Sequence, residues 1–179
     1  MYGIHADEET FIKSAILALI ETSNSGRKPQ VSNFVIGELK PLTIDPEFNT
    51  SITLKPNIHS EAYFGMIKVK YTRFNIGDYR VSKEDKQIEV PAIEVQTKAQ
   101  LINYMNELYL HSVTIQEKLK ANSLYNYLEQ TTYKGKQIEL KLENLKDFVL
   151  NYPSHGIVLI IEAKENSYLF TGSLRIKFV

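Results

Sequence analysis

The chain has 179 residues, no cysteine, and 21 basic residues that are balanced by 21 acidic ones. This length fits one domain with a sizeable core, and the absence of cysteine excludes disulfides, thiolate catalysis and cysteine-bound zinc. The neutral charge provides no general field for a polyanion, so we expect a single domain over residues 1–179 that is not a general nucleic-acid binder.

The N-terminal segment predicts a helix rather than a signal or a membrane anchor. Residues 1–9 lack the basic start and the small-residue cleavage site of a secretory signal. The apolar run at residues 15–20 is far shorter than the ~18 residues that suggest a membrane span. Asp7 can cap an amphipathic helix over about residues 7–23, because its apolar residues recur at helical spacing. These residues are Phe11, Ile12, Ala15, Ile16, Leu19 and Ile20.

Strands are expected next along the chain. Residues 34–44 predict an extended segment that is broken near Gly37 and Pro41. Ile52 and Leu54 alternate with polar neighbours, and residues 63–74 continue this pattern. Side chains on successive residues of a strand point to opposite faces. Both segments therefore predict strands with one buried face.

A helix is expected in the middle of the chain. Thr97-Lys98-Ala99-Gln100 has the pattern of a capping box, in which the threonine and glutamine side chains bind free backbone groups. The apolar residues that follow lie on one helical face, at Leu101, Tyr104, Met105 and Leu108. Thr114 starts a second pattern of this kind, which predicts a shorter helix or a single turn.

The final third predicts strands again. Ile138, Leu140 and Leu142 alternate on one face, and a second alternating set comprises Tyr168, Phe170, Leu174, Ile176 and Phe178. The continuous apolar run at residues 157–161 is typical of a strand covered on both sides or of a sheet centre. Asn166-Ser167 suits the turn of a final hairpin. Strands on both sides of a helical middle predict an α+β fold with an antiparallel or mixed, sandwich-like sheet.

No pattern of catalytic or metal-binding residues emerges, so we predict no catalytic, cofactor-binding or metal site and no enzyme. The four histidines lie far apart, and His59 with Glu61 supplies only two of the three protein ligands of a catalytic zinc. Residues 134–136 lack the glycine spacing of a phosphate-binding loop. An enzyme with a dispersed site stays an alternative, because carboxylate and histidine sites need not be local in sequence.

The segment at residues 68–74 interleaves basic and aromatic residues, as do single-stranded nucleic-acid binders that stack bases. The ordinary alternation of a half-buried strand produces the same pattern, with Lys68 and Lys70 facing water and Tyr71 facing the core. A phage or bacterial module that binds single-stranded nucleic acid or a host protein through Lys68, Lys70 and Arg73 is therefore the alternative function.

Three segments, in this order, resemble structural proteins of large tailed bacteriophages. They are NTSITL at residues 49–54, YFGMIKVKYTRF at residues 63–74 and the closing YLFTGSL at residues 168–174. Together with the helix from Thr97 to Leu110 and the segment from Thr114, they extend the resemblance over about residues 45–178. The chain departs from the pattern at Phe64, where threonine or serine is commoner, and at Phe74, where an aliphatic residue is commoner.

The resemblance implies a non-enzymatic virion protein in the tail, neck or capsid, and it brings no site residues. Such a protein contacts other virion proteins and forms a homo-oligomer in a symmetric assembly. We expect no cofactor and neither a membrane nor a nucleic acid as partner. We expect the chain to be made in the cytoplasm of the host bacterium and to reside in the virion. The helix at residues 7–23, outside the shared region, packs on the chain's own sheet or docks onto a neighbouring subunit.

Overall fold

The computed structural model describes residues 10, 12–14, 16–17, 31–58, 65–79, 87–112, 117 and 139–179. The chain divides into two compact units. Unit 1 comprises residues 1–73 and 121–137, and unit 2 comprises residues 74–120 and 138–179. Each unit is described by itself, and the expectation of a single domain over residues 1–179 stays a prediction.

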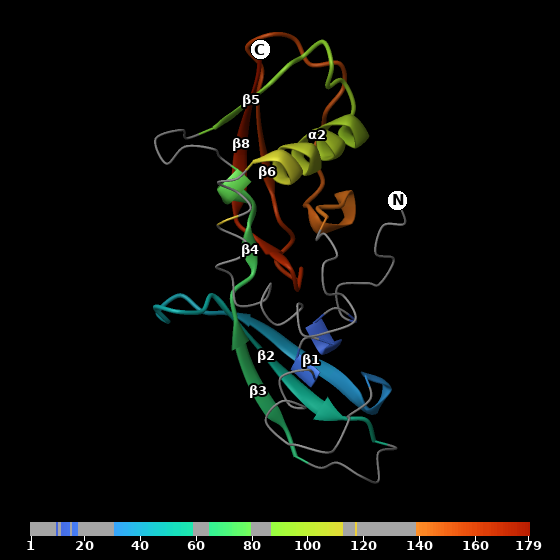
Figure 1. Cartoon of the computed structure of the whole chain (residues 1–179), viewed down its shortest axis with the longest axis vertical. Coiled ribbons are helices and arrows are strands. Elements are labelled where there is room, and N and C mark those ends of the chain that lie inside the picture. The colour runs from blue at the N-terminus through green and yellow to red at the C-terminus, as the bar shows by residue number, and fades with distance from the viewer. Residues whose placement is uncertain are drawn as a thin grey trace. The chain divides into compact units, whose positions relative to one another are not determined.

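Unit 1 contains a three-stranded antiparallel sheet in the order β1-β2-β3 (Figure 1). The 3-10 turn η1 (Val31–Asn33) precedes β1 (Phe34–Pro41), and β2 (Thr50–Pro56) and β3 (Ile67–Tyr71) follow. The pairing of β1 with β2 shifts register between Ile36 and Leu39, which is the break predicted near Gly37. A Cβ atom on Gly37 would collide with Oγ1 of Thr53, so this glycine allows the two strands to approach closely.

The core of unit 1 lies on one face of this sheet. Ile52, Leu54 and Tyr71 are at most 1% exposed. Ile12 and Ile16, in the described part of the N-terminal helix, are 1% and 3% exposed. Because these two described side chains are buried within the chain, the structure favours a helix that packs on the chain itself over one that docks onto a neighbour.

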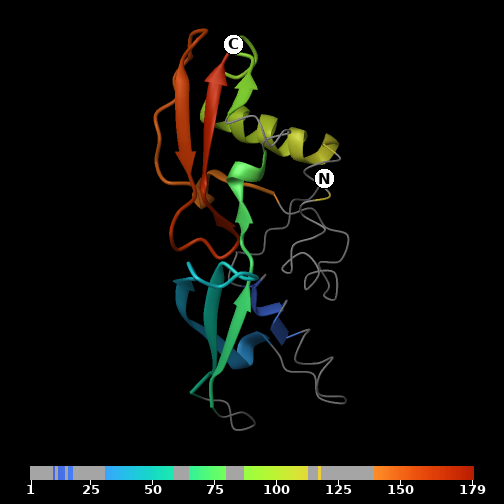
Figure 2. The same ribbon diagram turned by 90° about the vertical axis from the view of Figure 1, so that its left-hand side faces the viewer.

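Unit 2 contains a three-stranded mixed sheet and a short parallel strand pair. In the order β5-β8-β6, β5 (Ile88–Val90) runs parallel to β8 (Ser173–Phe178), and β6 (Val158–Glu162) runs antiparallel to it. Strand β4 (Phe74–Asn75) pairs in parallel with β7 (Phe170–Thr171). The 3-10 turns are η2 (Ile76–Tyr79) and η3 (Leu142–Asn144). Figure 2 shows the strands of the mixed sheet side by side.

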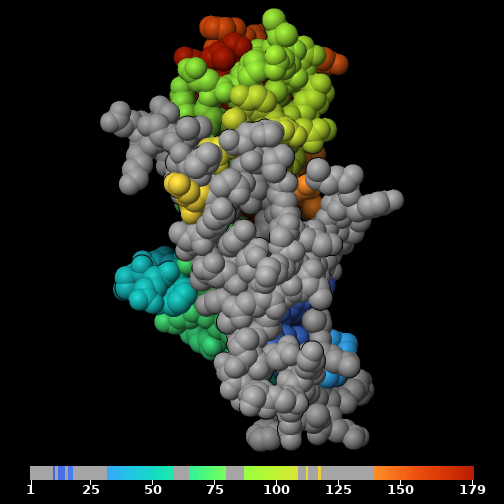
Figure 3. Space-filling view, in the orientation of Figure 1, coloured from blue at the N-terminus to red at the C-terminus, as the bar shows by residue number. Residues whose placement is uncertain are grey.

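The helix α2 (Lys98–His111) begins at the predicted capping box. The Gln100 N–H donates to Thr97 Oγ1 at 3.3 Å, and the Thr97 N–H donates to Gln100 Oε1 at 3.1 Å. Leu101 and Met105 on the predicted apolar face are both 0% exposed. The helix lies alongside the three strands of the mixed sheet in Figures 1 and 2, and its other side is at the surface in Figure 3.

The fold class is α+β with antiparallel and mixed sheets, which confirms the prediction from the sequence. One predicted strand is wrong in its described part, because Leu142 lies in η3 and Leu140 is in no strand. The Asn106 side chain of α2 donates to the Leu140 carbonyl at 2.9 Å and accepts from the Leu140 N–H at 3.0 Å. This side-chain amide satisfies backbone groups that a neighbouring strand would otherwise bind. No described helix is long and apolar enough to cross a membrane.

Strands β6 and β8 form the predicted final hairpin, but with a longer connection than expected. The predicted turn is present, because the Ser167 N–H donates to the Lys164 carbonyl at 3.1 Å. Strand β7 then interrupts the connection before β8 begins. Gly172, with φ of 84°, makes this change of direction in a backbone region that favours glycine.

Candidate functional site

The mixed sheet of unit 2 exposes aliphatic side chains on one face. Val158 and Ile160 of β6 are 40% and 55% exposed, whereas Ile161 on the other face of β6 is 1% exposed. Ile157, which precedes β6, is 50% exposed. Strand β6 lies at the edge of the sheet, because β8 occupies the centre. The prediction of a strand covered on both sides or at the centre of a sheet is therefore wrong. The apolar run has one buried and one open face.

Strand β8 adds polar and basic side chains to the same face. Its pairing with β6 places Arg175 opposite Ile160 and Lys177 opposite Val158. Exposed Ser173 and Arg175 alternate with buried residues along β8, as expected for a strand with one covered face. The surface formed by the following residues is called the outer face of unit 2. It comprises Val158, Ile160, Glu162, Ser173, Arg175 and Lys177, and Glu162 forms an ion pair with Lys146 at 2.9 Å.

A hollow of about 400 Å³ adjoins this outer face, and its volume is in the range of small ligand sites. Its lining residues come from β4, η2, β6 and the start of β8. They are Asn75, Gly77, Ile160, Gly172, Ser173, Leu174 and Arg175. The polar side chains among them are an amide, a hydroxyl and a guanidinium, and none of these residues is acidic. The lining therefore suits a partly apolar group that carries a hydrogen-bond acceptor or a negative charge.

Local contacts fix the polar groups around the hollow. The Gly77 N–H donates to Asn75 Oδ1 at 2.9 Å. A Cβ atom on Gly172 would collide with the same oxygen, so the glycine is needed where the Asn75 side chain packs. Arg175 Nε donates to Gln87 Oε1 at 3.1 Å, which holds the guanidinium at the sheet surface.

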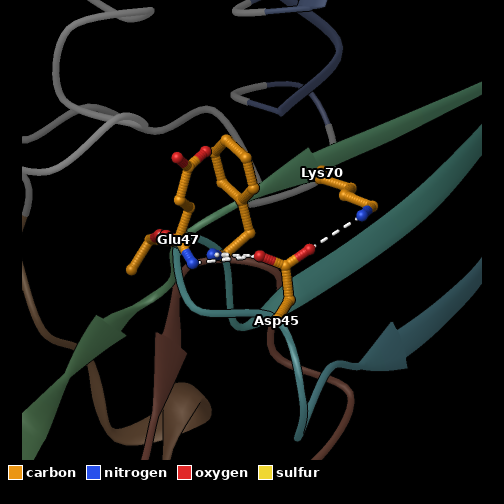
Figure 4. A network of polar contacts seen from close by, with 5 residues as sticks. Asp45, Glu47 and Lys70 are labelled. Carbon is orange, nitrogen blue, oxygen red and sulfur yellow. Dashed lines mark hydrogen bonds and ion pairs between the residues drawn. The ribbon is translucent and has the colours of Figure 1, made fainter.

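In unit 1, Asp45 links the loop before β2 to strand β3. Its Oδ2 accepts from Lys70 Nζ at 2.7 Å, and its Oδ1 accepts from the N–H groups of Glu47 and Phe48 at 3.0 and 3.1 Å. Figure 4 shows this carboxylate between the loop and the lysine. The hydrogen bond from Lys70, followed by the two backbone N–H groups, lowers the pKa of Asp45 from 3.8 to about 2. This contact holds the loop to strand β3, and it places the charge of Lys70 in an ion pair with Asp45.

A buried polar network joins β2 to the segment that follows β3. Arg73 is 5% exposed, and its Nε donates to Thr50 Oγ1 at 2.8 Å. Thr50 Oγ1 donates to Asn49 Oδ1 at 2.8 Å, and the Arg73 N–H donates to the same oxygen at 2.8 Å. These residues belong to two of the three segments that carry the resemblance to phage structural proteins. Their contact gives the residues a structural role, while the resemblance itself stays a prediction.

The basic residues proposed for nucleic-acid binding do not form one exposed set. Arg73 is buried, and Lys70 is bound to Asp45. Lys68 is exposed, and it forms no ion pair with a described residue. Tyr71 and Phe74 are only 1% and 5% exposed, so their rings cannot stack on bases. Burial of the arginine and the aromatic rings therefore disfavours binding of single strands through Lys68, Lys70 and Arg73 as one exposed set, and the alternative function stays a prediction.

The other candidate residues from the sequence are mostly outside the described part of the chain. This applies to His5, His59, Glu61 and residues 134–136. His155 is exposed, and only the backbone of His111 is described. Within the described ranges, no group of three or more histidine and acidic residues could hold a metal ion. That the chain has no catalytic, cofactor or metal site stays a prediction.

The sequence analysis missed the residues around the hollow. Alternation along residues 173–178 was a usable signal, since it places Ser173 and Arg175 on the face opposite Leu174. Asn75 had no such signal. It reaches the hollow only because β4 pairs with β7, which is far away in the sequence.

One family of known sequences covers nearly the whole chain. A family of unknown function (DUF7941) matches residues 9–179. No curated protein and no solved structure matches the chain significantly.

Proposed function

The chain belongs to the DUF7941 family, whose function is unknown, and we propose that it is a non-enzymatic structural component of a tailed bacteriophage virion. It acts through protein–protein contacts in the tail, neck or capsid. The likeness of residues 49–54, 63–74 and 168–174 to phage structural proteins supports a place in the particle. The chain is made in the cytoplasm of the host bacterium and joins other virion proteins during assembly.

The outer face of unit 2 is the observation that carries this proposal. Exposed aliphatic side chains that lie together on one face of a strand are a feature of protein contact sites. Full burial of such a side chain contributes about 1.5–3 kcal/mol, so side chains already half-covered contribute roughly 1 kcal/mol each. Val158 and Ile160 together therefore supply a modest contact energy.

A modest contact suits a protein that is present in many symmetric copies. When one surface patch binds a different patch on the next copy, or on a neighbouring protein, repetition closes rings or extends lattices. Each contact is then supported by its neighbours, so no single contact must be strong. The outer face of unit 2 provides one side of such a contact, with aliphatic residues from β6 beside basic residues from β8.

The substitution Val158→Asp in the phage that encodes the chain tests this function. Val158 lies on the outer face but not in the hollow. We expect a folded protein whose amount in purified particles falls at least tenfold, because a buried contact would have to desolvate the new carboxylate. The matched control is Ile93→Asp, since Ile93 is 87% exposed in unit 2 and lies outside the outer face. Equal incorporation of both variants at the wild-type level would contradict the proposal.

A further inference from the structure

We propose that the hollow beside the outer face of unit 2 binds an acidic side chain, an aspartate or a glutamate, that a partner virion protein presents among aliphatic residues. The inference rests on the proposed function and adds the chemistry of the contact. It begins with charge, because Arg175 is the charged residue in the lining and none of the lining residues is acidic. The hollow therefore attracts an anionic group.

The guanidinium of Arg175 is available for such a group. Its Nε is occupied by Gln87, and its two terminal nitrogens bind no described residue. The contact with Gln87 limits the rotation of the side chain, while the terminal nitrogens stay free to donate. A guanidinium with free terminal N–H groups forms charge-assisted hydrogen bonds with a carboxylate.

Two neutral donors complete the polar side of the hollow. Asn75 uses its Oδ1 to accept from Gly77, so its amide nitrogen is the group that remains for a ligand. Ser173 is exposed at the start of β8 and contributes a hydroxyl. One positive charge with two neutral donors matches a singly charged carboxylate, whereas a phosphate commonly recruits more positive charge.

The surroundings of the hollow indicate that the carboxylate belongs to a protein segment. Ile160 both lines the hollow and belongs to the outer face. Val158 continues the exposed aliphatic surface beyond it on the same face of β6. A small free carboxylate would leave these side chains in water. An acidic residue with aliphatic neighbours would place its charge at Arg175 and cover the aliphatic surface at the same time.

Peptide binding to the full-length, nitrogen-15-labelled chain tests this inference by NMR. The probes are acetyl-Leu-Glu-Leu-amide and its neutral counterpart acetyl-Leu-Gln-Leu-amide. We expect the glutamate peptide to shift the amide signals of Gly77, Gly172 and Ser173 in a saturable way. The glutamine peptide should bind about fivefold more weakly, as expected for the loss of one partly exposed ion pair. Equal binding of the two peptides, or shifts confined to other residues, would overturn the inference.

Two variants test whether Arg175 causes the preference for the glutamate peptide over the glutamine peptide. Arg175→Gln should remove the preference for glutamate, because it removes the positive charge in the hollow. Lys177→Gln removes the same charge from the same strand, two residues away and outside the hollow, and should keep the preference. Unchanged amide signals from α2 verify that both variants are folded. A preference that survives Arg175→Gln, or that is lost equally in Lys177→Gln, would contradict the assignment.

Two further ligands test whether the hollow binds a carboxylate of a protein segment, a small free carboxylate or a phosphate. Sodium acetate should bind far more weakly than the glutamate peptide, and acetate of equal affinity would show that no protein segment is required. Inorganic phosphate that displaces the peptide better than acetate does would assign the hollow to phosphate instead. These measurements do not involve the particle. A chain that is present in virions but does not bind the peptide disproves only this inference, whereas absence from virions disproves the proposed function.

Discussion

Single polar residues in unit 1 hold strands and loops together. Arg73 would be expected at the surface from its charge, yet it is buried where Asn49 and Thr50 accept its N–H groups. A buried charge of this kind is costly unless it is hydrogen-bonded, so its role is to join neighbouring segments. The same charge in the sequence suggested nucleic-acid binding, because composition cannot distinguish an exposed arginine from a buried one.

The ion pair between Asp45 and Lys70 predicts a specific titration. In Lys70→Met, we expect the pKa of Asp45 to rise from about 2 toward its ordinary value of 3.8, while the N–H groups of Glu47 and Phe48 still keep it somewhat lower. Lys68→Met is the matched control, since Lys68 lies on the same face of β3 and does not bind Asp45. Carbon-13 NMR of the Asp45 carboxyl group measures the pKa in each variant.

The sign of the stability effect follows from this pKa. Because folding lowers the pKa of Asp45, the ion pair stabilises the folded state above pH 3.8, and this contribution is lost as the pH falls toward 2. The stability of Lys70→Met should therefore depend less on pH in this window. An Asp45 pKa that stays at about 2 in Lys70→Met, or that rises equally in Lys68→Met, would contradict the account.

The features of helices and strands that could be predicted best are those with a local signal in the sequence. The capping box at Thr97 predicted the start of α2, because its partners lie within one helical turn. Alternation predicted which face of β3 and β8 is buried, because the period of a strand is a local property. Both signals depend on neighbours in the sequence, and both are confirmed by the burial of Tyr71 and Ile176.

Features that depend on distant partners were not predictable in the same way. The apolar run of β6 predicted burial, but the order of strands in the sheet places β6 at an edge. Leu140 alternates like a strand residue, but Asn106 of α2 binds its backbone. Asn75 lines the hollow because β4, which contains it, pairs with the distant strand β7. In each case a contact between remote segments decides the outcome.

The contact between α2 and Leu140 predicts a loss of stability in Asn106→Ala. Removing this side chain leaves the Leu140 N–H and carbonyl groups without their partner, which costs about 1–3 kcal/mol. Asn103→Ala is the matched control, because Asn103 is exposed on the same helix and its loss should change stability by less than about 0.5 kcal/mol. Urea denaturation followed by circular dichroism measures both, and equal stability of the two variants would be inconsistent with the described contact.

The chain has no net charge, and its described residues present two different exposed surfaces. The lysines of β3 lie on the open face of the sheet in unit 1, and Lys70 there is already paired with Asp45. The outer face of unit 2 combines aliphatic residues with Arg175 and Lys177. The second surface is the better candidate for contact with another protein, because it joins apolar area to unpaired charge and to a hollow.

Mass spectrometry of purified particles of the phage that we propose encodes this chain, with heads and tails separated, distinguishes a virion component from an intracellular protein. The account predicts that the chain is present in one of these fractions at high copy number, together with its partner proteins. Absence of the chain from both fractions, while it is abundant in infected cells, would contradict a structural role in the virion and would favour an intracellular binding module.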